Sequence, residues 1–417
     1  MLRAIVPVTG LMLSTFFLLA GSGLTGVLLP LRAGIEGWSP VIIGWIGFGY
    51  SACFTAGCVV VPRLVLRVGH VRVYAVLATL LSMSLLLHAL FVNPLTWIAF
   101  RGIAGFALAG SYMIVESWLN EKATNETRGQ IFSIYMIINM VGLMAGQFMV
   151  LFGDPATTSL FMFAAMLYAM AVIPTGLSNA ISPQPLTQVT FDLRKLYRNS
   201  PAALVGIFWA GIIAGAWNFQ APVFAELIGL SGSSIPLMLA LAMIGGAIFQ
   251  LPLGRASDKM DRRYMMVATG VVGVVVSLIF VAVPAASDTI AVFVLMFFFG
   301  AVLFPIYSLV NAHANDYAEA SDFVEISSSL LIVTGIGSMI GPVLAGWFMN
   351  TIGAQGFFVA MGLSYAIFGG YAGWRITQRD AAPTEDMTDF TYMPGTRSQT
   401  PETMNLDPRS EEGEMSA

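Results

Sequence analysis

Long apolar stretches constrain the fold of this chain more than any other feature of its sequence. Twelve of them follow one another, joined by mostly short connections. A stretch of about 20 apolar residues matches a helix that crosses the hydrocarbon core of a bilayer. Lipid offers the backbone no hydrogen-bond partners, so spanning segments are helices or closed barrels. The period-two alternation of barrel strands is absent, which predicts an all-α integral membrane protein. The expected spans are residues 5–31, 40–61, 71–92, 95–116, 128–152, 159–180, 201–223, 234–253, 264–284, 289–312, 323–349 and 356–376.

The composition excludes a soluble protein. The chain is 57% hydrophobic and only 10% charged, whereas about 25% of the residues in a typical soluble domain are charged. Cys53 and Cys58 fall in one apolar stretch, so we interpret them as small packing residues. The three histidines are scattered, and we expect no metal site and no cofactor. The sequence contains no phosphate-cradling loop and no hydrolase constellation, so we expect neither an ATP-driven pump nor an enzyme.

The longest internal connection divides the chain into two parts. Residues 181–200 contain prolines and basic residues between the sixth and seventh apolar stretches. From residue 380 on, the sequence is acidic and poor in aliphatic side chains, which is typical of disorder. We therefore expect an N-terminal six-helix half (1–180), a cytoplasmic linker (181–200), a C-terminal six-helix half (201–379) and a disordered acidic cytoplasmic tail (380–417).

Basic residues indicate the orientation of the chain, because they concentrate in cytoplasmic loops. With the N-terminus placed in the cytoplasm, 17 of the 19 Lys and Arg residues fall on the cytoplasmic side. The other two are Arg32, in an outer loop, and Arg101, inside an apolar stretch. We expect a multi-pass protein of a bacterial inner membrane, with both termini in the cytoplasm.

The two halves repeat each other at a nearly constant spacing. Gly142-x-x-x-Gly146 recurs 195 residues later as Gly337-x-x-x-Gly341, and Gly23 recurs as Gly215 at an offset of 192. Further pairs at an offset of 195 are Gly105 and Gly300, Tyr112 and Tyr307, and Glu116 and Asn311. We therefore predict two pseudo-symmetric halves. Parallel repeats of this kind are a transporter architecture, with the solute site between the halves near mid-membrane.

A charged stretch from Gly254 to Arg263 separates the eighth and ninth apolar stretches. It resembles the signature loop of the major facilitator superfamily, which reads glycine, aspartate and a basic residue, then glycine and two basic residues. Asp261 stands here where the second glycine is expected. A weaker copy at residues 62–72 keeps the glycine and the basic residues but has Leu66 in place of the aspartate. The resemblance covers residues 5–376 and implies the twelve-helix fold of these transporters.

The resemblance also implies a gate on the cytoplasmic side. In the superfamily the loop aspartate docks against a helix start in the opposite half, where free N–H groups and the helix dipole favour a negative charge. Here Asp258 would face the start of the fifth span, near Thr127 and Arg128. The residues expected to form the gate are Gly254, Arg255, Asp258, Lys259, Arg262, Arg263, Arg63, Arg67 and Arg128.

The first loop lacks the aspartate, and two interpretations of it stay open. Its expected target, the start of the eleventh span, carries Asp322 and Glu325. In the first interpretation, Arg63 or Arg67 meets Glu325 in a latch of reversed charge. In the second, the two acidic residues cap a helix and the two arginines face lipid headgroups.

Two ionisable residues in the fourth span are candidates for proton coupling. A charge at the depth of Arg101 is costly and by default indicates a function. Arg101 also resembles the span-four arginine that is linked to proton transfer in some members of the superfamily. Glu116 and Glu325 are the leading carboxylates for carrying a proton. In the alternative interpretation, Arg101 binds carbonyls of a neighbouring helix and Glu116 marks the cytoplasmic interface.

Polar and aromatic side chains inside the spans are candidates for contact with a solute. Amides and hydroxyls outnumber charges among them, so we expect a neutral or amphipathic solute. In the alternative interpretation, each of them holds neighbouring helices together by hydrogen bonds. The candidates are Tyr50, Arg101, Tyr112, Asn139, Trp217, Asn218, Gln220, Tyr307 and Asn311.

Three further patterns resemble a small bacterial branch of the superfamily whose substrate is unassigned. They are Arg101-x-x-x-Gly105, Val115-Glu116-Ser117 shortly before Arg128-Gly129, and Gly337-x-x-x-Gly341-Pro342. We expect a monomeric secondary transporter that moves a small molecule by alternating access and is coupled to protons. Its other partner is membrane lipid, and we expect no nucleic acid. The alternative is a receptor or assembly protein that keeps the fold and moves no solute, and within transport both import and efflux stay open.

Overall fold

The computed structural model describes residues 8–124, 127–176, 186, 191–282, 289–318, 323–380, 390 and 399–405. Twelve helical segments in this part of the chain are long and apolar enough to cross a membrane, by their length and composition. They follow the order of the predicted spans, and no strand occurs among the described residues. The predicted all-α membrane fold is therefore confirmed.

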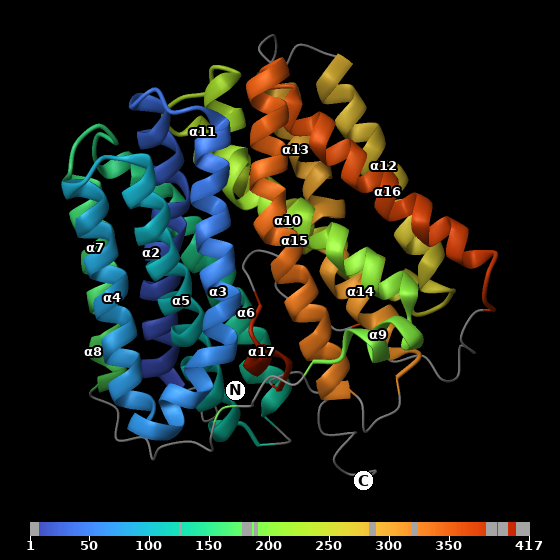
Figure 1. Cartoon of the computed structure of the whole chain (residues 1–417), viewed down its shortest axis with the longest axis horizontal. Helices are drawn as coiled ribbons and strands as arrows, with labels where there is room; N and C mark the ends of the chain where they lie inside the picture. Colours follow the sequence, from blue (N-terminus) through green and yellow to red (C-terminus); the bar gives the residue numbers. More distant parts are fainter. Residues whose placement is uncertain are drawn as a thin grey trace. The chain divides into compact units, whose positions relative to one another are not determined.

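The chain forms two compact units, whose helices are labelled in Figure 1. Unit 1 comprises Met1–Glu36, Gly49–Val189 and Gln399–Ala417, and unit 2 comprises Gly37–Phe48 and Thr190–Ser398. Unit 1 holds α2 (Thr9–Ile35), α4 (His70–Leu90), α5 (Pro94–Lys122), α6 (Arg128–Phe148) with η2 (Met149–Phe152), α7 (Ser159–Met170), α8 (Val172–Gly176) and α17 (Pro401–Asn405). Unit 2 holds α9 (Leu193–Asn199), α10 (Pro201–Leu227), α11 (Ser234–Ser257), α12 (Arg262–Ala282), α13 (Thr289–Leu303), α14 (Ile306–Asn315), α15 (Phe323–Ile352) and α16 (Gly356–Ile376). Residues of α3 (Pro40–Val68) belong to both units.

Glycines bring α2 and α6 into backbone contact in unit 1. A Cβ added at Gly146 would overlap the carbonyl oxygen of Ala20, and one added at Gly23 would overlap that of Leu143. Small residues allow helices in lipid to approach this closely, so that dispersion contacts and weak polar contacts hold them together. The two helices therefore form one tightly packed pair.

The same contact recurs between α10 and α15 in unit 2. A Cβ at Gly341 would overlap the carbonyl oxygen of Ile212, and one at Gly215 would approach that of Ser338. Ile212 follows Ala20 by 192 residues, and Ser338 follows Leu143 by 195 residues. The spacing of the sequence repeat is therefore also the spacing of the contacts within each unit.

Prolines divide two of the predicted spans. The sixth is broken at Ala171 into α7 and α8, because Pro174 has no N–H to donate to the carbonyl four residues before it. The tenth is broken at Phe304 and Pro305 into α13 and α14 for the same reason. The sequence analysis treats both spans as single helices, and the structure corrects it.

The connection between α3 and α4 is shorter than expected. α3 continues to Val68, beyond the predicted span end at residue 61, so Arg63 and Arg67 lie in its last turns and not in a loop. Gly69 alone separates the two helices. Its φ of 90° is readily adopted by glycine and strained for other residues. The glycine of the weaker signature copy is thus required by the turn.

The connection between α11 and α12 is also short. α11 continues to Ser257, beyond the predicted end at residue 253, and α12 begins at Arg262. Only Asp258–Asp261 lie between the helices. Most residues of the charged stretch Gly254–Arg263 are therefore helical, and the helix geometry fixes the orientation of their side chains.

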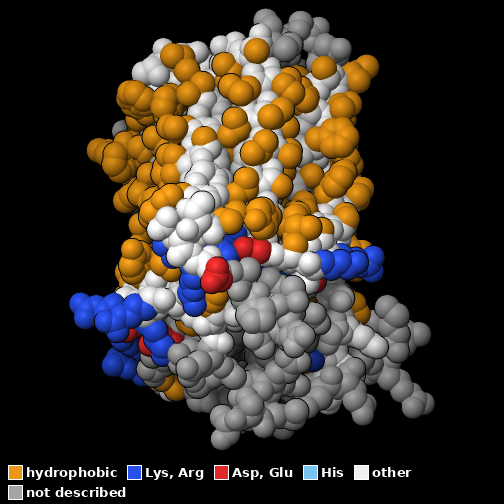
Figure 2. Space-filling view, turned by 90° about the vertical axis from the view of Figure 1, so that its right-hand side faces the viewer, with side chains coloured by type: hydrophobic (Ala, Val, Ile, Leu, Met, Phe, Trp, Pro, Cys, Tyr) orange, Lys and Arg blue, Asp and Glu red, His pale blue; other side chains and the backbone are white. Residues whose placement is uncertain are grey.

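Apolar side chains cover much of the face shown in Figure 2. The Lys, Arg, Asp and Glu side chains visible in that view gather at one end of the apolar surface. On α12, for example, Val271, Val275 and Leu278 are exposed. The largest apolar patch on a typical soluble monomer covers only a few hundred Å². A broad apolar surface with charges at one end therefore fits contact with lipid.

The C-terminal tail contains a short helix that the sequence analysis did not expect. α17 begins with Pro401, and proline suits the first position of a helix because its missing N–H has no partner there anyway. Thr400 and Thr403 are fully buried. The expected disorder is therefore corrected for residues 399–405, whose contacts with α5 are described below. Apart from Asp380 and Phe390, the rest of the tail lies outside the described residues.

Candidate functional site

One face of α14 carries buried polar groups that lack hydrogen-bond partners. Tyr307, Asn311 and Asn315 are spaced four residues apart, which places them along one side of the helix. All three are buried. The Tyr307 hydroxyl and both polar atoms of each asparagine side chain have no hydrogen-bond partner among the described residues. This face is the strongest candidate for contact with a solute in unit 2.

The free-energy cost of burying polar groups without hydrogen bonds explains why these side chains indicate a binding site. A buried polar group without a hydrogen bond costs about 1–3 kcal/mol. Such groups are rare in folded proteins and usually bind water or a ligand. Tyr307 and Asn311 were predicted from the sequence, whereas Asn315 was not. The four-residue spacing from Asn311 is the signal by which Asn315 could have been found.

Gln220, another predicted solute contact, instead joins helices within unit 2. Its Nε2 donates hydrogen bonds to the carbonyl oxygens of Pro40 (2.8 Å) and Pro342 (2.9 Å). The two acceptors belong to α3 and α15, and Gln220 is fully buried. These contacts match the alternative interpretation, in which the side chain holds neighbouring helices together.

Trp217 and Asn139 also have packing contacts. Asn139 donates its Nδ2 to the carbonyl oxygen of Tyr135, one turn earlier in α6 (2.6 Å). Trp217 is buried in a cluster of phenylalanine rings, and the neighbouring Asn218 is half-buried. The rings around Trp217 are those of Phe299, Phe304 and Phe357.

A buried arginine and a chain of aromatic rings form the polar interior of unit 1. Arg101 on α5 is 8% exposed, and its Cζ lies 4.4 Å from the centre of the Tyr50 ring. An arginine over an aromatic face gains cation–π energy, and more of it where water is excluded. Phe54 lies between Tyr50 and Tyr112, with ring centres 6.0 and 6.3 Å away. The structure thus brings together three predicted residues: Arg101, Tyr50 and Tyr112.

Glu116 is fully buried and accepts hydrogen bonds from three hydroxyl groups. Oε1 accepts from the Tyr135 hydroxyl (2.7 Å) and from the Thr403 hydroxyl (2.9 Å). Oε2 accepts from the Thr400 hydroxyl. Hydrogen bonds to a charged acceptor are stronger than those between neutral groups, which makes this a favourable environment for a carboxylate. The sequence analysis singled out Glu116 and missed all three partners.

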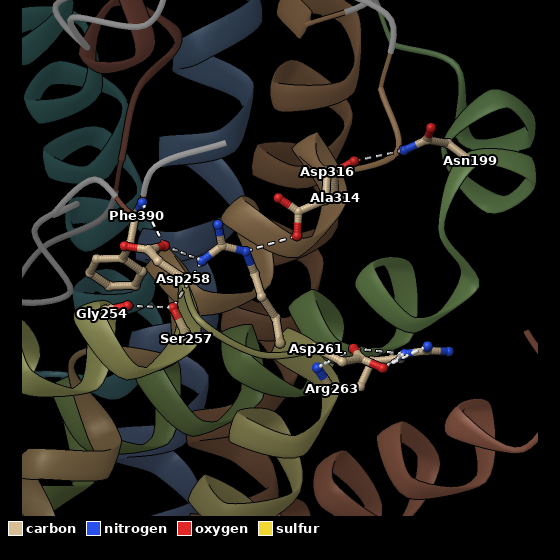
Figure 3. A network of polar contacts seen from close by, with 10 residues as sticks. Asn199, Gly254, Ser257, Asp258, Asp261, Arg263, Ala314, Asp316 and Phe390 are labelled. Atoms are coloured by element: carbon tan, nitrogen blue, oxygen red, sulfur yellow. Dashed lines mark hydrogen bonds and ion pairs between the residues drawn. The ribbon is translucent and has the colours of Figure 1, made fainter. Parts of the chain in front are cut away.

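Arg262 is the centre of the network in the charged turn, and its partners Ser257, Asp258 and Asp316 are labelled in Figure 3. It is fully buried, and its Nε binds Asp316 Oδ2 at 2.8 Å. Its Nη1 binds Asp258 Oδ1 and the Ser257 hydroxyl, both at 2.8 Å. The backbone N–H of Phe390, from the tail, also donates to Asp258 Oδ1 (3.0 Å). The two carboxylates thus compensate the buried charge of one arginine.

Arg263 ties the turn to α16. Its Nε and Nη2 bind both carboxylate oxygens of Asp261 at 2.7–3.0 Å. Its Nη1 donates to the carbonyl oxygens of Arg375 (2.9 Å) and Arg379 (2.8 Å). Burial of Asp261 acts to raise its pKa, but the hydrogen bonds and the charge of Arg263 hold that pKa below its usual range. Asp261, which replaces the second glycine of the signature, therefore has a structural partner.

Glu325 forms an ion pair that the sequence analysis did not consider. Its Oε2 lies 2.7 Å from Nζ of Lys195 on α9, and both side chains are about one-third exposed. The proposed pairing with Arg63 or Arg67 joins residues of different units and stays a prediction. The same holds for the docking of Asp258 at the start of α6. Of the other gate candidates, Arg255, Lys259, Arg63 and Arg67 are exposed and Arg128 is half-buried.

A bundle of twelve membrane-length helices with buried polar side chains has the architecture of a solute carrier. Sequence comparison agrees with this class. The sequence profile of the Major Facilitator Superfamily matches residues 11–329 and 222–387. The chain belongs to this superfamily and is a multi-pass secondary transporter, not an enzyme.

Two bacterial relatives cover most of the chain. The uncharacterized MFS-type transporter YcaD of Escherichia fergusonii is 24% identical over 346 residues, which are 82% of this chain and 89% of the relative. The protein of the same name from Escherichia coli is 24% identical over 348 residues, with the same coverage. These relatives agree with the predicted resemblance to a bacterial branch of unassigned substrate.

Solved structures with the same fold include two kinds of transporter. A crystal structure of a mutant of the nucleoside transporter NupG superposes with a TM-score of 0.76 at 14% identity, covering 88% of this chain and 99% of the other. A bacterial homolog to the human lysosomal transporter Spinster, in an inward-facing and occupied conformation, gives 0.71 at 14% identity. It covers 93% of this chain and 98% of the other. At these identities the likeness shows the shared fold.

Proposed function

We propose that this chain carries a small neutral or amphipathic solute across a bacterial inner membrane by alternating access, with both termini in the cytoplasm. One observation carries the proposal. The buried face of α14 offers the hydroxyl of Tyr307 and the amides of Asn311 and Asn315, none of them hydrogen-bonded within the described residues. An asparagine amide both donates and accepts, so these groups suit a solute with neutral hydrogen-bonding groups.

Coupling to protons is part of the proposal, and Glu116 is its main candidate. Glu116 is fully buried among hydroxyl groups, whereas Glu325 is paired with Lys195. A proton that binds Glu116 would neutralise a carboxylate inside the protein, which is what a proton-coupled carrier requires. Arg101 is the second candidate. It lies on α5, as Glu116 does, and its guanidinium lies over the ring of Tyr50 from α3.

Transport distinguishes a carrier from a receptor or assembly protein on the same fold. Purified protein would first be screened by thermal shift against neutral hydrogen-bonding solutes, with nucleosides as one class of probe. Hits would then be tested for uptake into proteoliposomes with and without a pH gradient. Saturable uptake that the gradient accelerates supports a proton-coupled carrier. Binding without uptake in either condition would favour the receptor.

The Asn311→Leu variant tests the α14 face. Leucine has the same branching and the same number of side-chain heavy atoms as asparagine, but it is bulkier and has no polar atoms. We expect the free energy of unfolding of the variant to rise by about 1–3 kcal/mol, and its unfolding temperature to rise with it. We expect its rate of uptake to fall at least tenfold. Thermal unfolding in detergent and uptake in proteoliposomes would measure the two effects.

Ser277→Ala is the matched control for Asn311→Leu. Ser277 is also buried in unit 2, but its hydroxyl donates to the carbonyl oxygen of Gly273 on its own helix. We expect uptake by this variant to stay within twofold of the wild type. An Asn311→Leu protein that transports normally would refute the assignment of this face to the solute.

The Asp258→Asn variant tests the proposed gate. Asp258 accepts hydrogen bonds from Arg262 and from the Phe390 amide, and an asparagine keeps the shape but removes the charge. We expect labelling of single cysteines on the two membrane faces to change severalfold in opposite directions, as the balance of inward- and outward-open states shifts. Glu121→Gln, which removes an exposed carboxylate of α5 outside the proposed gate, is the control. Equal labelling of Asp258→Asn and wild type on both faces would rule out this gate.

A further inference from the structure

We propose that residues Gln399–Asn405, hereafter the tail segment, form an intramolecular plug that binds at Glu116 and closes this part of unit 1 to solvent. The segment contains α17 and packs against α5 within the same unit. Of the three hydroxyls that donate to the Glu116 carboxylate, two belong to the tail segment. The inference that the plug inhibits transport rests on the proposed function.

The tail segment binds Glu116 as a ligand would, by donating hydrogen bonds to a buried carboxylate. Glu116 lies in the interior of unit 1, where a carboxylate without hydrogen-bond donors is strongly disfavoured. Tyr135 of α6 supplies one donor to Oε1. Thr403 supplies a second donor to the same oxygen, and Thr400 supplies the donor to Oε2. The tail segment therefore donates a hydrogen bond to each oxygen of the Glu116 carboxylate.

The short helix explains how both threonines reach the same carboxylate. Thr400 and Thr403 are three residues apart, which places them on one side of the turn. The Thr403 backbone N–H donates to the Thr400 carbonyl oxygen (3.1 Å), and Pro401 starts the helix. Both threonine side chains are completely buried. The segment thus presents a pair of hydroxyl groups in a fixed geometry, as a hydroxyl-bearing ligand would.

A second part of the tail is held by unit 2. The Phe390 amide donates to Asp258, and the Phe390 ring fills the space beside Gly254, where an added Cβ would overlap it (Figure 3). The tail therefore contacts both the candidate proton carrier and the candidate gate.

Hydrogen exchange of the full-length protein tests whether the hydroxyls hold the tail segment. In a Thr400→Val, Thr403→Val double variant, shape is kept and the two hydroxyl donors of the tail segment are lost, while the Tyr135 hydroxyl remains. We expect the amides of residues 399–405 to exchange at least tenfold faster than in the wild type. A Thr400→Ser, Thr403→Ser double variant keeps the hydroxyls and should exchange within about threefold of the wild-type rate. Unchanged exchange in the valine variant overturns the proposal.

A test variant and a matched control also probe the contact from the side of Glu116. Glu116→Gln removes the charge that attracts the threonine hydroxyls, so exchange of the tail segment should again rise at least tenfold. Glu121→Gln removes an exposed charge five residues further along α5 and should have no effect. Equal exchange rates in these two variants would show that Glu116 does not bind the tail.

Cysteine labelling tests whether the segment is a plug. In a protein with Cys53 and Cys58 replaced by alanine, Ser117→Cys reports on access to the buried end of α5, since Ser117 is 6% exposed. We expect the valine double variant to raise the labelling rate at least fivefold. Faster exchange of the tail without faster labelling would overturn the plug.

Uptake then tests inhibition. With a solute identified, the valine double variant should transport severalfold faster than the serine variant, and an equal or lower rate contradicts an inhibitory role. Hydrogen exchange and labelling need no solute. If no solute is transported, the proposed function fails while these two measurements still decide whether the tail segment is a plug.

Discussion

A Gly23→Val variant is expected to lose most of its folded population in detergent. Even a single Cβ at Gly23 would overlap the carbonyl oxygen of Leu143, and the backbone of α6 has no room to move because Gly146 packs equally closely against α2. Overpacking of a tight core typically costs about 1–3 kcal/mol and sometimes more. The overlap here is with backbone, so we place the loss at or above the upper end of that range. The monodisperse fraction in size-exclusion chromatography and the thermal midpoint would measure it.

Gly26→Val on the same helix is the control. An added Cβ at Gly26 meets nothing within 4 Å, and valine has a slightly better helix propensity than glycine. We expect this variant to fold with a stability within about 1 kcal/mol of the wild type. If Gly23→Val and Gly26→Val were equally stable, the close packing of α2 on α6 would be refuted.

An Arg262→Met variant is expected to be destabilised by about 3–5 kcal/mol, because it leaves buried carboxylates without their cation. The Asp316 side chain is only 1% exposed, and Arg262 Nε is bound to it. Asp258, the other acidic partner of Arg262, is 29% exposed and can be hydrated more easily. Most of the loss should therefore come from Asp316. Thermal unfolding in detergent would measure it.

Two further variants separate the ion pair from other effects of the substitution. Arg255→Met changes the same residue type at an exposed position of the same stretch, and we expect a change within about 0.5 kcal/mol. Adding Asp316→Asn to Arg262→Met removes the buried charge that has lost Arg262 and should recover part of the lost stability. A double variant no more stable than Arg262→Met alone would mean that the pair with Asp316 contributes little.

The spans could be predicted from the sequence because they follow from a single physical requirement. Lipid forces a spanning backbone into helices, so apolar length indicates each span. The repeat of Gly142-x-x-x-Gly146 predicted two similar halves, but it did not predict which helices these glycines bring into contact. The breaks in spans six and ten were missed because proline is tolerated within membrane helices and does not by itself indicate a division.

The tail partners of Glu116 and the lysine partner of Glu325 could not be predicted, because they lie far from these residues in the sequence. Thr403 and Glu116 are 287 residues apart, and Lys195 and Glu325 are 130 apart. A composition typical of disorder describes the average of the tail, whereas a few hydroxyl contacts are enough to order one short segment. The two carbonyl partners of Gln220 lie 180 and 122 residues away and could not be predicted for the same reason.

The close pairing of α2 with α6 also sets the order in which the protein can assemble during synthesis. Leu143 follows Gly23 by 120 residues, so at about 5–20 residues per second the contact surface of α2 waits roughly 6–24 s for its partner. α3, α4 and α5 are made in that interval. Ser338 follows Gly215 by 123 residues, so α10 faces the same delay before α15. Each unit thus completes this close helix contact late, and a ribosome that stalls before α6 would leave the glycine face of α2 unpaired in the membrane.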